Sequence, residues 1–222
     1  MKGLTRRKIL GMLGTAPFAA SLLPELSAQE FDSSNESSRE KIRQRYFPNL
    51  TLTTHEGKKV RFYDDLLKDK IVLINMMYAK CDGICMPVTM NLRKVQSLLG
   101  DRVGRDIFFY SITLKPEEDS PSALKRYAEM HGVKPGWLFL TAAPADIELL
   151  RRKLGFTNPD PKLDADKSQH IGMVRYGNEQ LQLWAACPGM ANPSWIFESV
   201  SFVDWPKVRP AAARPGEKGE RQ

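Results

Sequence analysis

Two cysteines, Cys81 and Cys85, have the type and spacing that could do chemistry, with three residues between them. An apolar run over residues 71–78 precedes them, and apolar residues at helical spacing follow. They are therefore predicted to lie in the turn between a buried strand and a helix. Pro87 suits the first turn of that helix, which places its start near Ile84 or Cys85. The unbonded amides and positive dipole end would then favour thiolate, the form that binds metals and attacks disulfides.

The spacing leaves more than one use of this pair open. Dedicated redox enzymes with a thioredoxin fold have two residues between their cysteines, whereas Cys81 and Cys85 have three. The longer loop can close a disulfide, and it can equally present both sulfurs to one metal ion. Two thiolates need a further ligand. An imidazole beside them suits copper in either oxidation state, whereas a structural zinc site needs four ligands. Two alternatives remain: the cysteines act in redox chemistry without a metal, or they are two small apolar residues buried in the core.

The surrounding pattern predicts an α/β domain. Its expected strands are 60–63, 71–78, 107–113 and 137–141. Its expected helices are the one that begins near residue 84 or 85 and ends at 99, then 120–131, 144–154 and 195–203. Two further strands, 171–176 and 180–184, are expected to form a hairpin around Gly177-Asn178. Strands alternate with helices first, and a hairpin follows. This is the order of a thioredoxin-like fold, a central mixed sheet flanked by helices with a C-terminal hairpin.

Three motifs, in this order, resemble those of the Sco/SenC family of copper-binding proteins. The first, residues 78–87, reads Tyr-Ala-Lys-Cys-Asp-Gly-Ile-Cys-Met-Pro and is similar to the copper-site loop of the family. The second, residues 111–121, reads Ser-Ile-Thr-Leu-Lys-Pro-Glu-Glu-Asp-Ser-Pro and is similar to its strand-end motif. In the third, Gln169-His170 occupies the place of the single histidine ligand. The resemblance covers residues 50–184, most of the domain.

The resemblance implies a thioredoxin fold and a copper ion held by Cys81, Cys85 and His170. It also implies a role in assembling the dinuclear copper centre of cytochrome c oxidase. The chain departs from the family pattern, which has Pro after each cysteine and an acidic residue before the histidine. Here Asp82 follows Cys81, Met86 follows Cys85, and Gln169 precedes the histidine. These changes bear on affinity and client identity more than on the ligand set, because neighbours of a ligand orient it and tune its basicity.

The leading hypothesis is a copper carrier, active as a monomer, rather than a turnover enzyme. Its partner would be a respiratory oxidase subunit or another copper protein, which would receive Cu(I) or Cu(II). The alternative is a thiol-disulfide oxidoreductase that reduces client cysteines and requires Cys81 and Cys85 but not His170. A peroxidase or redox sensor of the same fold is a third reading, and it needs one cysteine of low pKa.

Other residues that could do chemistry are interpreted as structural. Taken alone, His170 is an ordinary histidine at a strand edge, while His55 and His131 are expected to be structural or exposed. Cys187 is expected to be an unpaired thiol. The methionines at 86 and 90 are expected to fill the core rather than bind metal.

The two ends of the chain differ from the domain. Residues 1–28 have paired arginines before an apolar stretch, the pattern of a twin-arginine signal peptide or a membrane anchor. Residues 29–46 are expected to be a polar linker, 47–205 the domain and 206–222 a disordered basic tail. Residues 1–28 and residues 206–222 each carry +3 of the net charge of +7, so the domain between them is nearly neutral. The nearly neutral domain argues against nucleic-acid binding. The signal pattern of residues 1–28 predicts an exported protein, periplasmic or held at the outer face of the inner membrane.

Overall fold

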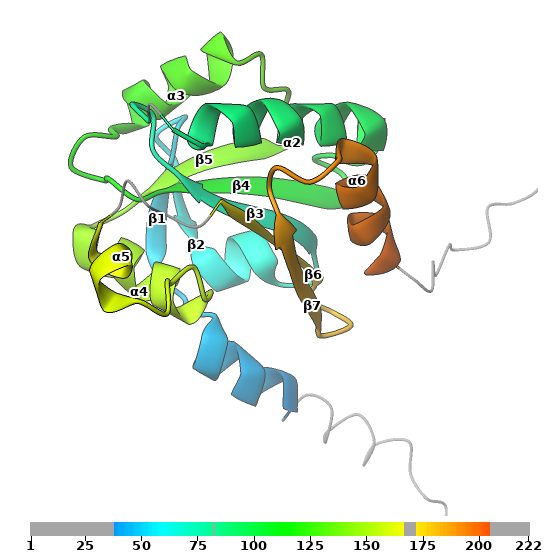
Figure 1. Cartoon of the computed structure of the whole chain (residues 1–222). Coiled ribbons are helices and arrows are strands. Elements are labelled where there is room, and N and C mark those ends of the chain that lie inside the picture. Colours follow the sequence, from blue (N-terminus) through cyan, green and yellow to red (C-terminus); the bar gives the residue numbers. More distant parts are fainter. Residues whose placement is uncertain (1–37, 82, 167–171, 205–222) are drawn as a thin grey trace, which may run out of the picture.

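The computed structural model describes residues 38–81, 83–166 and 172–204, which form a mixed sheet with helices on both faces (Figure 1). The strand order is β2-β1-β5-β4-β3-β6-β7. The expected thioredoxin-like architecture with a C-terminal hairpin is confirmed. The expected signal, the basic tail, Asp82 and the Gln169-His170 pair lie outside the described residues. Within the described residues, no helix has the length and apolar character needed to cross a membrane.

The strands and helices follow one another along the chain in an α/β order. The strands are β1 (Thr51–Thr54), β2 (Lys59–Arg61), β3 (Ile71–Met77), β4 (Ile107–Thr113), β5 (Trp137–Thr141), β6 (Met173–Asn178) and β7 (Leu183–Pro188). The helices are η1 (Phe62–Leu67), α2 (Cys85–Leu99), η2 (Gly100–Arg102), α3 (Pro121–Met130), α4 (Pro144–Lys153), α5 (Pro161–Ala165) and α6 (Pro193–Phe202), and residues 38–46 form a further helix.

The centre of the sheet is β3. It pairs in parallel with β4 and antiparallel with β6, and all of its residues are buried. This explains its nearly continuous apolar sequence, because helices cover both faces of a parallel pair. Since β3 and β4 run in the same direction, their carboxyl ends meet at one edge of the sheet. The cysteine loop after β3 therefore lies beside the segment after β4, as contacts from Asp119 to Ala79 show.

The helices divide between the two faces of the sheet. In Figure 1, α2, α3 and α6 lie on one face, and η1, α4 and the helix at 38–46 lie on the other. The start of α3 is fixed as expected, because the Ser120 hydroxyl accepts a hydrogen bond from the Ala123 amide at 3.2 Å and Pro121 follows it. Gly100 at the end of α2 has φ 56°, a conformation that favours glycine.

Three local expectations differ from the structure. The hairpin turn is not at Gly177-Asn178; both residues lie in β6, and the turn spans 179–182. Gly177 is small because the Trp184 ring of β7 lies across it, where a Cβ would collide. The strand expected at 60–63 ends at Arg61, where η1 begins. The helix at 38–46 lies in the stretch whose polar composition predicted a linker.

Candidate metal centre

The cysteine loop connects the end of β3 to the first residue of α2. Cys85 opens α2, with Ile84 as its N-cap residue, so the expected position at a strand-to-helix turn is confirmed. Cys85 is 2% exposed, while Cys81 is only partly buried. Neither cysteine forms a disulfide. The two side chains nevertheless hydrogen-bond to one another, so the loop brings both sulfurs to one place.

The two thiols have opposite pKa shifts. Partial burial raises the pKa of Cys81, but hydrogen bonds from the Cys85 thiol, the Cys85 backbone and Tyr78 outweigh this and bring it below the ordinary value. Burial raises the pKa of Cys85 well above the ordinary value, and its hydrogen bond with Cys81 adds to the shift. The expected preference for thiolate therefore holds for Cys81 only. At Cys85, desolvation outweighs the hydrogen bond from the Tyr78 backbone, which lowers the pKa.

Tyr78 is a site residue to which the sequence assigned no role. Its side chain hydrogen-bonds to Cys81, and its backbone hydrogen-bonds to Cys85. The Lys115 ammonium lies 4.5 Å from the centre of the Tyr78 ring. The ammonium and the face of the ring attract one another, which holds the Tyr78 side chain against the segment after β4. Tyr78 thereby links the segment after β4 to the more accessible thiol.

Asp119 is a second such residue. It is 2% exposed and accepts hydrogen bonds from the Ala79 amide at 3.0 Å and from the Thr113 hydroxyl at 2.6 Å. Its charge also contributes to the raised pKa of Cys85. The buried carboxylate therefore fixes the start of the cysteine loop and places negative charge near the thiols. Its position in the strand-end motif was the signal that could have identified it.

His170 lies outside the described residues, but Gly172, two positions later in the chain, is described. Gly172 packs against Ile84 in the cysteine loop so closely that a Cβ would collide. The Gly172 carbonyl accepts a hydrogen bond from the Gly189 amide at 2.7 Å, and Gly189 in turn approaches Val88 of α2. Among the described residues, no group of three His, Cys, Asp or Glu side chains could hold a metal ion. The two sulfurs form only part of the predicted ligand set.

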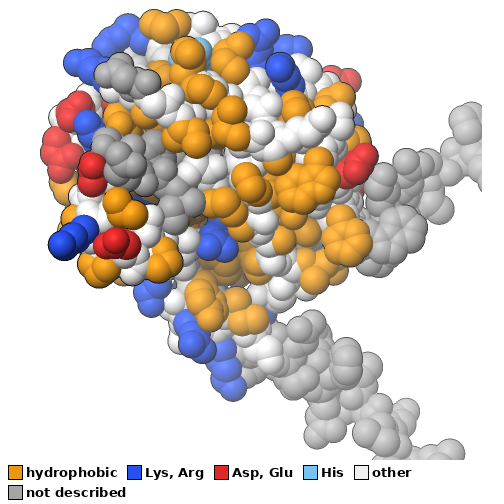
Figure 2. Space-filling model, in the orientation of Figure 1, with side chains coloured by type: hydrophobic (Ala, Val, Ile, Leu, Met, Phe, Trp, Pro, Cys, Tyr) orange, Lys and Arg blue, Asp and Glu red, His pale blue; other side chains and the backbone are white. Residues whose placement is uncertain are grey.

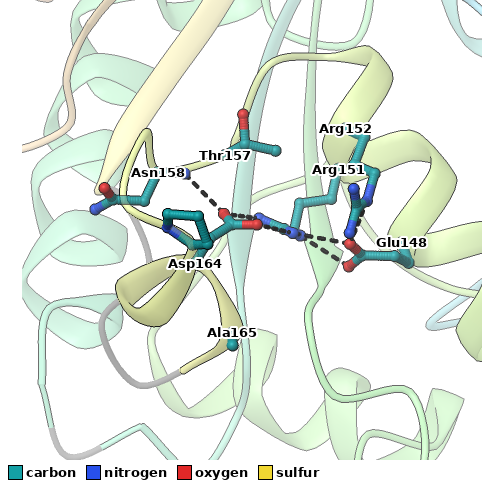
Figure 3. Close-up of a pocket in the computed structure, with 8 residues that line it drawn as sticks. Glu148, Arg151, Arg152, Thr157, Asn158, Asp164 and Ala165 are labelled. Carbon is teal, nitrogen blue, oxygen red and sulfur yellow. Dashed lines mark hydrogen bonds and ion pairs between the residues drawn. The ribbon is translucent and has the colours of Figure 1, made fainter.

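The last helix before residues 167–171 is α5, and contacts with Arg151 fix its position. Arg151 of α4 is almost fully buried and hydrogen-bonds to both Asp164 oxygens, at 2.6 and 2.7 Å, and to Glu148 (Figure 3). Arg151 also donates to the Phe156 carbonyl at 3.0 Å. Figure 3 shows the guanidinium between the two carboxylates at the edge of a pocket. This ion-pair network fixes α5, and the Gly172 contacts fix the residues just before β6, so the described residues on both sides of positions 167–171 are held in place.

The remaining candidates have structural surroundings or lie at the surface. His55 accepts a hydrogen bond from the Phe139 amide at 3.2 Å, and His131 packs against the Tyr127 ring, as expected. Cys187 is a buried thiol whose pKa burial raises to about 11. The expectation that the two methionines fill the core is wrong, because Met86 is 52% exposed and Met90 is 37% exposed.

Known proteins share both the sequence pattern and the fold. A family model described as SCO1/SenC matches residues 38–199. A curated relative, the SCO1 protein homolog of Bacillus subtilis, is 29% identical over 101 residues. That match covers 45% of this chain and 51% of the relative, so the chain spans about half the length of the relative.

Two solved structures have the same fold. Yeast Sco1 with copper bound has a TM-score of 0.56 and 21% identity, over 74% of this chain and 94% of that one. BsSco, described as having a disulfide switch and as a member of the Sco family of cytochrome c oxidase assembly proteins, has a TM-score of 0.57 and 23% identity. It covers 70% of this chain and 91% of its own. Since the family model matches most of the chain, the protein belongs to the SCO1/SenC family.

Proposed function

We propose that this protein binds one copper ion through Cys81, Cys85 and His170 and delivers it to another copper protein. The observation that carries the proposal is the thiol pair at the turn between β3 and α2. One sulfur is partly exposed and the other is buried, and the two are hydrogen-bonded to each other. Soft thiolates select copper, and an imidazole completes a three-ligand set. The copper-bound structure of yeast Sco1, which has the same fold, supports this choice of metal.

The contacts of Gly172 support His170 as the third ligand. Gly172 touches Ile84, which lies between the two cysteines in sequence. Two residues span at most about 7 Å of chain, so the histidine backbone is tethered close to the loop. An imidazole extends further from that backbone. The contacts of Gly172 are therefore compatible with ligation by His170.

The unequal thiols give metal loading and release a definite order. Cys81 has the lower pKa and the greater exposure, so its thiolate is the first sulfur to meet an incoming ion. Cys85 must lose a proton to bind, so loading releases a proton and weakens at low pH. Transfer proceeds by ligand exchange, in which thiols of the client replace those of the carrier one at a time, beginning at Cys81.

The proposed client is a respiratory oxidase subunit. The family membership of the chain and the description of BsSco as a cytochrome c oxidase assembly protein support this. The proposed location is outside the inner membrane, because residues 1–28 have the pattern of an export signal or anchor. In this account, residues 1–28 direct export, and the domain that follows binds the copper ion.

A copper titration of the purified protein tests the proposal. One equivalent of Cu(II) should bind and produce a thiolate-to-copper charge-transfer band. His170→Ala should change that band, whereas His55→Ala, the matched control at a histidine bonded to the Phe139 amide, should leave it unchanged. Absence of the band, or a band that His170→Ala does not alter, contradicts the assignment.

The pKa difference between the thiols also supports the second candidate, thiol-disulfide exchange. The Cys81 thiolate would attack a client disulfide, forming a mixed disulfide and releasing one client thiolate. The deprotonated Cys85 would then attack the Cys81 sulfur, closing their own disulfide and releasing the second client thiol. Cys85→Ser should trap the mixed disulfide. Client reduction that persists in His170→Ala would select this reaction, while failure of the trap would exclude it.

A further inference from the structure

Two exposed methionines, Met86 and Met90, lie on α2 directly after the cysteine loop. They are 52% and 37% exposed, although methionine is among the residues most often buried. Figure 2 shows hydrophobic side chains at the surface over α2 and α3, with Lys and Arg side chains around them. Residues four apart on a helix are neighbours on one face, with Cβ atoms about 5–6 Å apart. The helix therefore presents a pair of neighbouring thioethers to solvent.

The direction of helical side chains leads from this pair to Cys81. A side chain on a helix leans toward the helix N-terminus and covers the preceding turn. Met90 therefore leans toward Met86, and Met86, the second residue of α2, leans toward Gly83 in the loop. Gly83 is exposed, and a Cβ at that position would lie 3.8 Å from the Cys81 Sγ. The two thioethers and the partly exposed Cys81 thiol thus follow one another on the accessible side of the loop.

The groups around the pair favour a soft metal ion. Thioether and thiolate sulfurs select Cu(I), whereas carboxylates and water suit magnesium, calcium and manganese. The first turn of α2 contains no acidic residue, so Met86 has no carboxylate beside it there to hold a hard cation. Arg93 and Lys94 follow on the helix and are exposed to water, and the Arg93 guanidinium donates to the His131 carbonyl at 3.3 Å. Neutral thioethers tolerate these solvated cations, since water screens exposed charges.

The burial of the cysteine pair gives such thioethers a use. Cys85 is 2% exposed and Cys81 is only partly exposed, so an ion from solution meets little sulfur surface at the pair itself. A ligand tethered beside a second site presents its ion at an effective concentration in the millimolar range. An ion held by the exposed thioethers would therefore encounter Cys81 far more often than a free ion would.

We propose that Met86 and Met90 form an entry site that holds Cu(I) at the surface and passes it to Cys81. The proposal rests on the copper-carrier function proposed above. Transfer is a ligand exchange, in which each copper–thioether bond breaks as a bond to the Cys81 or Cys85 thiolate forms. Copper stays Cu(I) and no electron moves. The thioethers leave as neutral groups, and the proton that each thiol loses passes to water.

The first experiment measures Cu(I) binding, without oxygen, to the full chain after the main site has been removed. Cys81→Ser, Cys85→Ser and His170→Ala together remove that site. One equivalent of Cu(I) should still bind, and it should shift the methyl NMR signals of Met86 and Met90. Zn(II), whose protein ligands are thiolate, imidazole and carboxylate groups, should not shift these signals.

Met130 is the matched control, because it is 78% exposed at the end of α3 and is the only methionine of that helix. Its methyl signal should not move. Met86→Leu should weaken Cu(I) binding at least about tenfold, because a single thioether lacks the tethered second ligand. Met130→Leu should leave the affinity unchanged.

The second experiment measures transfer in the parent protein. A Cu(I) complex of bicinchoninate supplies the metal, and the loss of its colour reports loading of the cysteine site. The chelator is kept in an excess that leaves the weaker entry site empty at equilibrium. Met86→Leu combined with Met90→Leu should slow loading at least about threefold, because the tethered ion is lost. The final copper content should remain one equivalent.

Two results would overturn the entry site: methionine signals that Cu(I) does not shift, and a loading rate that the double variant does not change. In either case, parent copper that His170→Ala still alters would leave the carrier function intact. Shifted methionine signals in a parent whose copper His170→Ala does not alter would instead remove the carrier function and keep the thioether pair. If the variant without the main site does not fold, the parent decides. Its first equivalent of Cu(I) fills the cysteines, and a second should shift the Met86 and Met90 signals.

Discussion

Asp119 and Glu179 are both acidic and almost fully buried, at 2% and 1% exposure, yet their surroundings differ. Asp119 accepts hydrogen bonds from neutral donors, the Ala79 amide and the Thr113 hydroxyl. Glu179 accepts from a cation, Arg39, at 2.8 Å, and also from the Tyr63 hydroxyl at 2.7 Å and the Asp69 amide at 2.8 Å.

The presence or absence of a cation partner matches the role of each carboxylate. The charge of Asp119 has no cationic partner among these contacts, so it acts on the Cys85 thiol and is part of the site. The charge of Glu179 is neutralised by Arg39, so it only attaches the helix at 38–46 to the sheet. A buried carboxylate is thus a structural clamp where a cation meets it and a source of local field where none does.

The largest effect is expected for Asp119→Ala. Removing the carboxylate leaves the partly buried Ala79 amide and the buried Thr113 hydroxyl without this acceptor, so the free energy of unfolding should fall by about 2–4 kcal/mol. Urea denaturation measures this. Asp119→Asn keeps one acceptor and should cost less. An Asp119→Ala protein as stable as the parent would show that these hydrogen bonds contribute nothing.

A smaller effect is expected for Glu179→Gln. It removes the charge that Arg39 meets but keeps an acceptor, and Arg39 is partly exposed, so the loss of stability should be about 1–2 kcal/mol. Hydrogen exchange should become faster in residues 38–46 while the cysteine loop is unchanged. Protection that falls equally in α2 would contradict the separation of the two regions.

The attachment of the helix at 38–46 should also depend on pH. Burial alone would raise the pKa of Glu179, but hydrogen bonds from Arg39, the Asp69 amide and Tyr63 outweigh it and bring the pKa below the ordinary value. A carboxyl with a lowered folded pKa stabilises the fold above its unfolded pKa, about 4.3, and this contribution disappears as the pH falls through the folded pKa. Acid titration of helix exchange rates measures it. Glu179→Gln should flatten the dependence below about pH 4, and an identical acid profile in both proteins would refute the assignment.

The smallest effect is expected for Tyr78→Phe. Losing the hydroxyl that hydrogen-bonds to Cys81 should raise the pKa of Cys81 by less than about one unit, with little change in stability. The pH dependence of Cys81 alkylation, followed by mass spectrometry, measures the shift. Tyr127→Phe is the matched control, because that hydroxyl lies 2.9 Å from the Thr89 hydroxyl. An equal shift in both variants would remove Tyr78 from the site.

In the middle of the domain, local sequence patterns were enough to predict the strands and helices. The apolar run of β3 and the Ser120-Pro121 start of α3 are properties of neighbouring residues, and both predictions are confirmed. The turn between β6 and β7 was misplaced because Gly177 is small for a tertiary reason, the ring of Trp184. The helix at 38–46 was missed because its partner Glu179 is 140 residues away from Arg39.

In the site, too, features that depend on residues distant in the sequence could not be predicted. The position of Cys81 and Cys85 followed from the strand and helix on either side. Their opposite pKa shifts did not, because they depend on burial and on Tyr78 and Asp119, which only the folded chain brings together. The assignment of His170 came from resemblance, and that residue lies outside the described part of the chain.

The central claim is that one copper ion is held by two sulfurs and one imidazole. X-ray absorption at the copper edge, on the protein loaded with one equivalent, tests it most directly. The account predicts two sulfur scatterers and one histidine nitrogen, with the nitrogen shell lost in His170→Ala and retained in His131→Ala. A shell of three or more sulfurs, or a nitrogen shell that survives in His170→Ala, would contradict it.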